Sequence, residues 1–105
     1  MSTDLADLGR FSEPALLLLA SLAGGPKHAY AMVEDIARLS GVRLRVTTLY
    51  SALARLEQRG LVEALPPAER RRPYQLTAAG TAALGEQLTY METLAAAGRA
   101  RLATS

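Results

Sequence analysis

A leucine stripe of helical spacing, followed at once by short apolar runs, constrains this chain more than any other feature. Leu49, Leu53 and Leu56 recur at i, i+4 and i+7, and Gly60 ends the pattern. Such spacing predicts an amphipathic helix that buries one face. Because apolar residues resume directly after the glycine, this helix must turn straight into extended chain.

The extended chain after Gly60 is expected to form a β-hairpin. Leu61 to Leu65 has the composition of a strand, and Tyr74 to Leu76 has that of a short returning strand. Pro66 to Pro73 separates them as a loop. The hairpin is therefore predicted to have a basic tip, formed by Arg70, Arg71 and Arg72.

Two further helices are predicted on the N-terminal side. Ser12 is a suitable N-cap for Ala15 to Leu22, a segment that is apolar on every face and therefore expected to be buried. The Gly-Gly-Pro sequence at residues 24–26 ends this helix. A second helix is predicted from about His28 to Ser40, with Gly41 as its C-terminal cap.

The segment between the second and third helices is predicted to be an extended segment or a short strand. Val42 to Val46 alternates strictly between apolar and basic residues, which is the period of extended chain. Thr47 or Thr48 then caps the third helix through its hydroxyl. The residues of that helix that fall away from the leucine stripe are Ser51, Ala54, Arg55, Gln58 and Arg59.

A long last helix is predicted from Thr77, as its cap, to about Ala103. Its larger apolar residues recur at intervals compatible with a heptad repeat. A helix of this length projects beyond the hairpin, so a second copy of the chain is the expected partner for its apolar seam. The alternative is that the first seam residues pack back on their own domain. The seam consists of Leu84, Leu88, Met91, Ala95 and Leu102.

The elements follow the order helix, helix, strand, helix, strand, basic loop, strand, long helix. This order predicts a mainly α protein with a small β-hairpin wing. We expect a winged helix-turn-helix domain over residues 1–80, N-terminal arm included, and a C-terminal dimerisation helix over residues 81–105. Half of the chain is apolar, with one Phe and no Trp, which fits a core of aliphatic side chains on helices.

Basic charge is concentrated in the middle third of the chain. Between Arg38 and Arg72 there are eight arginines against three glutamates, although the whole chain carries only +2. In a winged helix the third helix enters the major groove, and cations around it meet phosphates. Duplex DNA is therefore the expected partner, with specificity assigned to Thr48, Ser51 and Arg55. The full set of expected DNA contacts is Arg43, Arg45, Thr47, Thr48, Tyr50, Ser51, Arg55, Arg70, Arg71 and Arg72.

Four residues admit both a functional and a structural interpretation. Tyr50 either donates to a phosphate or packs beside the leucine stripe, and the sequence leaves both open. Tyr74 is expected to fix its strand, and Tyr30 is expected to contact the core or the first helix. His28 is interpreted as a local capping or packing residue, with a phosphate contact or a pH sensor as the alternative.

Several motifs resemble the PadR family of bacterial transcriptional regulators, over residues 15–85. The resemblance implies a dimeric repressor whose third helix and wing bind an inverted-repeat operator, with the C-terminal helix forming the dimer. Ala29 stands where the family usually has glycine, and residues 46–48 stand where it often has Pro-Gly-Thr. The motifs are KHAYAM from Lys27, TLYSAL from Thr48, RLE from Arg55, GLV from Gly60 and RPYQLTAAG from Arg72.

The residue inventory argues against an enzyme. There is no Cys, one His and no glycine-rich phosphate loop after a strand, so no catalytic residue, metal site or cofactor is expected. The longest apolar run is shorter than a membrane span, and the absence of Cys fits a cytoplasmic location. A winged helix that serves only protein–protein interaction is the alternative function, which the basic surface disfavours. A small-molecule effector is left unassigned, because no Trp is present to stack on a flat ligand.

Overall fold

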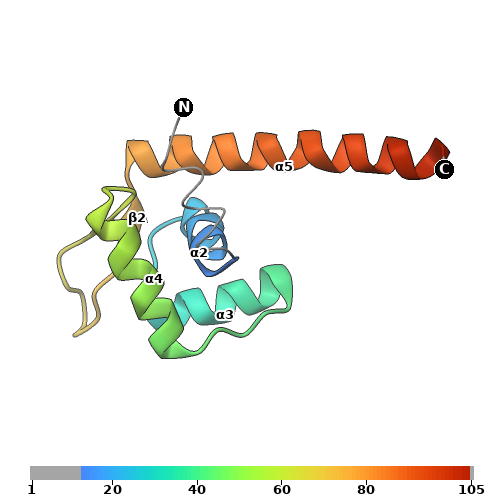
Figure 1. The fold of residues 1–105 in the computed structure, drawn as a ribbon. Helices are drawn as coiled ribbons and strands as arrows, with labels where there is room; N and C mark the ends of the chain where they lie inside the picture. The colour runs from blue at the N-terminus through green and yellow to red at the C-terminus, as the bar shows by residue number, and fades with distance from the viewer. Residues whose placement is uncertain (1–12, 105) are drawn as a thin grey trace.

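Four helices and a two-stranded antiparallel sheet make up the part of the chain that the computed structural model describes, residues 13–104 (Figure 1). The predicted fold class is confirmed, since the protein is mainly helical with a small hairpin. The predicted cap Ser12 and the N-terminal arm lie outside the described residues. The elements are α2 (Glu13–Ala23), α3 (Ala29–Ser40), α4 (Val46–Gln58), β1 (Val62–Ala64), β2 (Tyr74–Leu76) and α5 (Ala78–Thr104).

The core forms where the apolar faces of α2, α3 and α4 meet. α2 packs against both of the other helices, and the leucine stripe of α4 faces inward as predicted. This docking decides which face of α4 stays outside. The side chains with almost no exposure are Leu18, Leu19, Met32, Ile36, Leu49, Leu53, Leu56 and Val62.

A polar network holds the turn between α2 and α3. Ser21 Oγ donates to Asp35 Oδ2 at 2.7 Å, and Lys27 Nζ donates to the Ser21 carbonyl at 2.6 Å. Lys27 Nζ also lies 3.8 Å from Asp35 Oδ2. Because Ser21 is buried, the network satisfies a hydroxyl that would otherwise destabilise the core. It also fixes Lys27 at the edge of the sheet.

Lys27 pairs with β2 on the edge opposite β1, through an isolated antiparallel β-bridge to Tyr74. Its backbone N donates to the Tyr74 carbonyl at 3.1 Å, and Tyr74 N donates to the Lys27 carbonyl at 2.9 Å. Of the two alternatives for residues 42–46, the short strand is wrong, because residues 42–45 form a loop without strand pairing and α4 begins at Val46. A strand requires a backbone partner, which an alternating pattern does not supply by itself. The turn before α3 lies against β2 and supplies that partner instead.

The start of α4 also differs from the prediction. The helix begins at Val46, with Arg45 at its N-cap and no hydrogen bond from a side chain to the cap. Leu49 N donates to the Arg45 carbonyl at 2.9 Å. The prediction that Thr47 or Thr48 caps the helix is therefore wrong, and both hydroxyls lie exposed in the first turn.

Three other helix ends agree with the predictions from the sequence. His28 is the N-cap residue of α3, and its Nδ1 lies 3.3 Å from the backbone N of Ala31. Gly41 follows α3 at a φ of 77°, a left-handed conformation that favours glycine. Thr77 Oγ1 accepts from the backbone N of Gly80 at 3.0 Å and so caps α5 as predicted.

The junction between the hairpin and α5 is tightly packed. Thr77 Oγ1 donates to the Gly60 carbonyl at 2.6 Å, and Thr77 N donates to the Leu61 carbonyl at 3.1 Å. Gly80 lies so close to that carbonyl that a Cβ on residue 80 would overlap it. A close approach of this kind requires glycine. The junction therefore sets the direction in which α5 leaves the domain.

α5 extends well beyond the other elements (Figure 1). With α5 included, the molecule measures 55 × 31 × 21 Å along its principal axes. Leu84 is 6% exposed and joins the core, whereas Leu88 is 44% exposed. Within residues 13–104, Leu84 is thus the last residue of α5 that is buried in the core. Within residues 13–104 no helix is both long and apolar enough to cross a lipid bilayer.

Candidate nucleic-acid interface

The outer face of α4 carries small polar and uncharged side chains. Thr47, Ser51, Ala54 and Gln58 are exposed, and they lie on the side opposite the buried leucine stripe. Their spacing of three and four residues keeps them on one side of the helix. None of these side chains is large enough to hold the helix away from a surface that it approaches.

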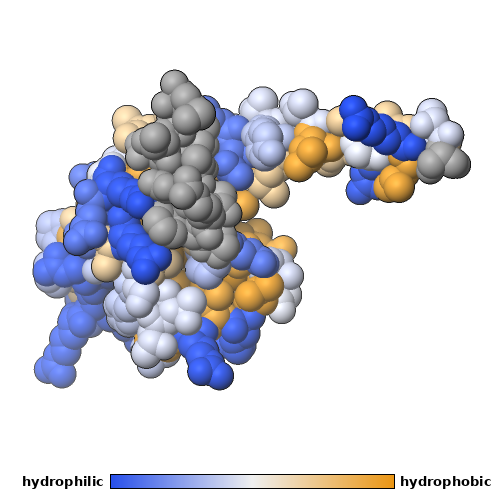
Figure 2. Space-filling view, viewed as in Figure 1, coloured by the Kyte–Doolittle hydropathy of each residue, from blue (hydrophilic) through white to orange (hydrophobic). Residues whose placement is uncertain are grey.

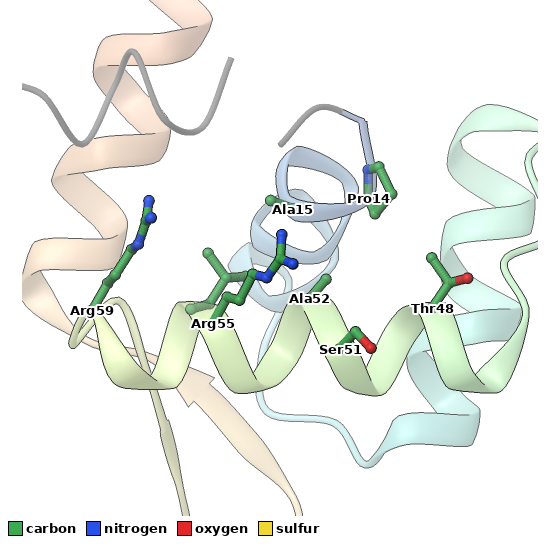
Figure 3. A pocket seen from close by; sticks show the side chains of 8 residues that line it. Pro14, Ala15, Thr48, Ser51, Ala52, Arg55 and Arg59 are labelled. Atoms are coloured by element: carbon green, nitrogen blue, oxygen red, sulfur yellow. The ribbon is translucent and has the colours of Figure 1, made fainter. Parts of the chain in front are cut away.

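Thr48 and Arg55 lie on the flank of α4 that faces the start of α2. Both line a hollow of about 130 Å³ together with Ser51 and Pro14. Figure 3 shows the Arg55 side chain directed toward the N-terminal end of α2, whereas Ser51 points away from it. Of the three residues assigned to specificity, Ser51 is thus the one that points away from α2.

Arg43 and Arg45 lie in the loop before α4, and both are exposed. Arg43 forms a two-pronged ion pair with Glu34 of α3, with both nitrogen–oxygen distances at 3.1 Å. The hydrogen bond and the positive charge of Arg43 lower the pKa of the Glu34 carboxyl below its ordinary value. Contact between Arg43 and a phosphate therefore competes with an acidic partner within the protein.

The tip of the hairpin is a tight turn. Ala68 and Arg71 exchange two backbone hydrogen bonds, at 2.7 and 2.9 Å. The two central residues, Glu69 and Arg70, have φ values of 50° and 66°. This left-handed conformation twists the turn to match the strands, at some cost in strain for residues other than glycine. It leaves all of Arg70, Arg71 and Arg72 exposed.

A groove of about 420 Å³ separates this tip from the helices. Three of the four tyrosines in the sequence line it, one each from α3, α4 and β2. Burial, and then the negative charge of Glu57, raise the pKa of the Tyr74 phenol above its ordinary value. Tyr50 and Tyr30 are exposed, so Tyr30 is not a core residue, which was one of its two expected roles. The other lining residues are His28, Ala29, Arg70, Arg71 and Arg72.

Two of the three wing arginines are tethered to the protein. Arg71 Nη1 lies 2.9 Å from His28 Nε2, and Arg72 Nη1 donates to the Leu65 carbonyl at 3.2 Å. These contacts hold the arginines beside the groove. Hydrophilic side chains crowd the end of the molecule formed by α4 and the hairpin, away from the tip of α5 (Figure 2). Among residues 13–104 no cluster of His, Asp or Glu could hold a metal ion.

Comparison with known proteins identifies the family. Residues 18–86 match the Transcriptional regulator PadR-like family. The chain belongs to this family. The resemblance that the motifs indicated is therefore confirmed, and the family is one of transcriptional regulators.

Solved structures agree with this PadR-like assignment. A PadR-like transcription factor from Bacteroides fragilis has a TM-score of 0.76 at 20% identity, covering 91% of this chain and 96% of its own. A PadR family regulator from Clostridium difficile has a TM-score of 0.75 at 21% identity, covering 85% and 97%. A transcriptional regulator from Clostridium thermocellum has a TM-score of 0.72 at 25% identity, covering 94% and 95%.

One curated relative is considerably longer than this chain. An uncharacterized 37.1 kDa protein in transposon Tn4556 of Streptomyces fradiae is 46% identical over 71 residues. The match covers 68% of this chain and 21% of that relative, so the chain spans about a fifth of its length. The shared segment has the size of a PadR-like winged helix.

The outer face of α4 contains two exposed residues beyond the expected DNA contacts. Ala54 and Gln58 share that face with Ser51 and are exposed. The signal was present in the sequence, because both lie opposite the leucine stripe at helical spacing. The position of His28 at the N-cap of α3 agrees with its interpretation as a local residue. Its contact with Arg71, 43 residues away, has no counterpart in any local pattern.

Proposed function

We propose that this PadR-like protein is a dimeric repressor that binds an inverted-repeat operator in duplex DNA. One observation carries the proposal: the outer face of α4 is small, polar and exposed, and arginines of the hairpin lie beside it. A helix enters the major groove only if its outer side chains are compact enough to reach base edges. Repression is supported by the family resemblance.

The roles within this interface follow from side-chain type. Thr47, Ser51 and Gln58 offer hydroxyl and amide groups that hydrogen-bond to base edges, and Ala54 offers a methyl group for thymine. Arginines around the helix supply phosphate contacts that position it without reading sequence. Those we assign to this role are Arg43, Arg45, Arg70, Arg71 and Arg72, with the Tyr50 hydroxyl as a further donor.

Dimerisation is assigned to the projecting part of α5. Leu88, Met91 and Leu102 are exposed along one side of the helix, as are Ala95 and Leu94. Figure 2 shows hydrophobic side chains along this projection, where no part of the described chain covers them. At ~25 cal/mol per Å² of apolar surface, burying these side chains stabilises a dimer by a few kcal/mol per subunit. Leu84 anchors the helix to its own domain instead.

The phosphate contacts are tested by salt titration of DNA binding. Replacing Arg70, Arg71 and Arg72 by Ala is expected to flatten the dependence of affinity on salt by roughly 0.9 in slope per lost contact and subunit. The double variant Arg99→Ala, Arg101→Ala is the matched control, because it removes similar charges from the far end of α5. An unchanged slope in the wing variant would show that the cluster is a solvated tip.

Arg55 is tested for base reading by selecting binding sites from random DNA with the wild type and with Arg55→Ala. If Arg55 contacts guanine, Arg55→Ala is expected to cost ~1 to 3 kcal/mol on the selected site and to relax one position in each half-site. If it contacts a phosphate, the variant binds all sequences more weakly and keeps its preferences. Failure of the wild type to bind any duplex at low salt would refute the proposed function and favour a protein-interaction module.

A further inference from the structure

His28 lies between two hydrogen-bond donors. Its Nδ1 is 3.3 Å from the backbone N of Ala31, and its Nε2 is 2.9 Å from Nη1 of Arg71. A backbone amide and a guanidinium both donate and neither accepts. A neutral imidazole has one acceptor nitrogen, so the two contacts cannot both be hydrogen bonds at once.

Each proton arrangement of the imidazole leaves two donors facing each other. With the proton on Nδ1, the shorter contact to Arg71 is a hydrogen bond, but Nδ1–H faces the amide of Ala31. With the proton on Nε2, the helix cap is formed, but Nε2–H faces the guanidinium. An imidazolium donates toward both. When Nε2 carries the proton, neither Nε2–H of His28 nor the guanidinium of Arg71 has an acceptor in this contact. An acceptor oxygen from outside the pair would satisfy both donors.

The surroundings of the pair favour an anion as the source of that oxygen. Arg70 and Arg72 line the same groove, together with the phenols of Tyr30, Tyr50 and Tyr74. Glu69 lines the adjoining hollow on the other side of His28. Lys27, the neighbour in sequence, directs its Nζ to the Ser21 carbonyl instead. The groove thus presents three arginines beside the imidazole.

We infer that a DNA backbone phosphate bridges His28 and Arg71 in the protein–DNA complex, with two of its oxygens facing the two neighbouring nitrogens. Arg71 donates to one phosphate oxygen, Nε2–H of His28 donates to another, and Nδ1 accepts from Ala31 as the cap of α3. This arrangement satisfies every donor that conflicts in the free protein. It rests on the proposed DNA-binding function and adds His28 to the interface, with Nε2 changing from acceptor to donor on binding.

Nitrogen-15 NMR of the imidazole tests this change directly, because His28 is the single histidine of the chain. The probe is a duplex of arbitrary sequence about two helical turns long, at low salt, since backbone contacts do not depend on sequence. We expect Nε2 to be unprotonated in the free protein and protonated in the complex. In free Arg71→Ala, Nε2 is expected to carry the proton already. An Nε2 that stays unprotonated in saturating duplex would overturn the inference.

Two substitutions separate the phosphate contact from the helix cap. His28→Asn keeps an oxygen near the position of Nδ1 and hence the cap, but does not reach the phosphate. His28→Gln places an amide N–H near the position of Nε2. We expect His28→Asn to lower affinity for the duplex about 3- to 10-fold with an unchanged melting temperature, and His28→Gln to retain most of the affinity.

The outcomes distinguish this inference from the function on which it rests. Equal duplex affinity of His28→Asn and the wild type overturns the His28 contact and leaves DNA binding intact. Absence of duplex binding by the wild type refutes the proposed function, and the inference with it.

Discussion

The three-helix core and the projecting part of α5 are built from the same residue types but differ in what covers them. Leu18, Leu49 and Leu53 are almost completely buried by their own chain. In α5, Leu94 is 57% exposed and Leu102 is 75% exposed. Aliphatic content alone therefore does not determine burial, which also requires another element of the described chain to lie against the side chain.

This difference separates two requirements on the sequence. The apolar side chains of the core must be covered by elements of the same chain. Such a helix therefore has an apolar stripe on one face and polar residues on the opposite face, as α4 does. The projecting helix has apolar residues that the rest of the described chain leaves exposed, and the proposed dimer is what removes them from water. We therefore expect substitutions in the core or at the junction to change folding, and substitutions beyond Leu84 to change association.

The largest effect is expected at the junction. Gly80→Ala places a methyl group onto the Leu61 carbonyl, so the start of α5 must move away from the hairpin. We expect the loss in free energy of unfolding to exceed both the ~1 to 3 kcal/mol typical of overpacking and the loss in the core variant below, because the clash is with backbone atoms, which cannot rotate away. Gly85→Ala is the control, because nothing lies within 4 Å of its Cβ position, and it is expected to stabilise by about 1 kcal/mol. Urea denaturation that ranked the two variants equally would contradict the described junction.

A smaller loss is expected within the core. Leu53→Ala removes a buried side chain at the centre of the stripe and is expected to cost about 2 to 5 kcal/mol in unfolding free energy. Leu39→Ala is the matched control on α3, where the side chain is exposed, and is expected to change stability by less than about 0.5 kcal/mol. Comparable losses in chemical denaturation would mean that the core is wrongly placed.

Charged substitutions in the apolar seam of α5 are expected to prevent dimerisation without unfolding the domain. The double variant Leu88→Lys, Met91→Lys introduces like charges into the proposed dimer interface, while both positions are exposed within one chain. We expect a monomer by light scattering and an unchanged helical circular dichroism spectrum. A wild type that is monomeric at micromolar concentration would contradict the assignment of these residues to a dimer interface.

The smallest effect is expected at the ion pair before α4. Glu34→Gln removes a carboxylate that pairs with Arg43, and is expected to raise affinity for DNA about two- to threefold at low salt. Because Arg43 lowers the pKa of Glu34, the wild-type pair is present at neutral pH and is lost only as the pH falls through that lowered value. Glu92→Gln on α5 is the control. Reduced affinity of Glu34→Gln in a fluorescence anisotropy titration would contradict the idea that Glu34 and DNA phosphates compete for Arg43.

Much of the architecture was predictable because it depends on local spacing. The leucine stripe, Gly41 and the Thr77 cap each express a contact within a few residues. The hairpin was predictable for the same reason, since its strands follow each other directly. The outer face of α4 was predictable as the complement of its buried face.

The remaining features depend on partners distant in sequence. Lys27 pairs with Tyr74 only because the turn before α3 lies against β2, and no pattern around Lys27 indicates this. Residues 42–46 have the alternating pattern without the partner. Arg43 was expected to face DNA, and its ion pair with Glu34 depends on how the loop crosses α3.

Selection of binding sites from random DNA tests the central claim most directly. If the seam of α5 presents two copies of α4 on one face, the wild type is expected to recover an inverted repeat with half-sites about 10 base pairs, or a multiple of that, apart. The variant with Leu88→Lys and Met91→Lys is expected to recover at most a single half-site. Recovery of no two-fold motif by the wild type would contradict the account.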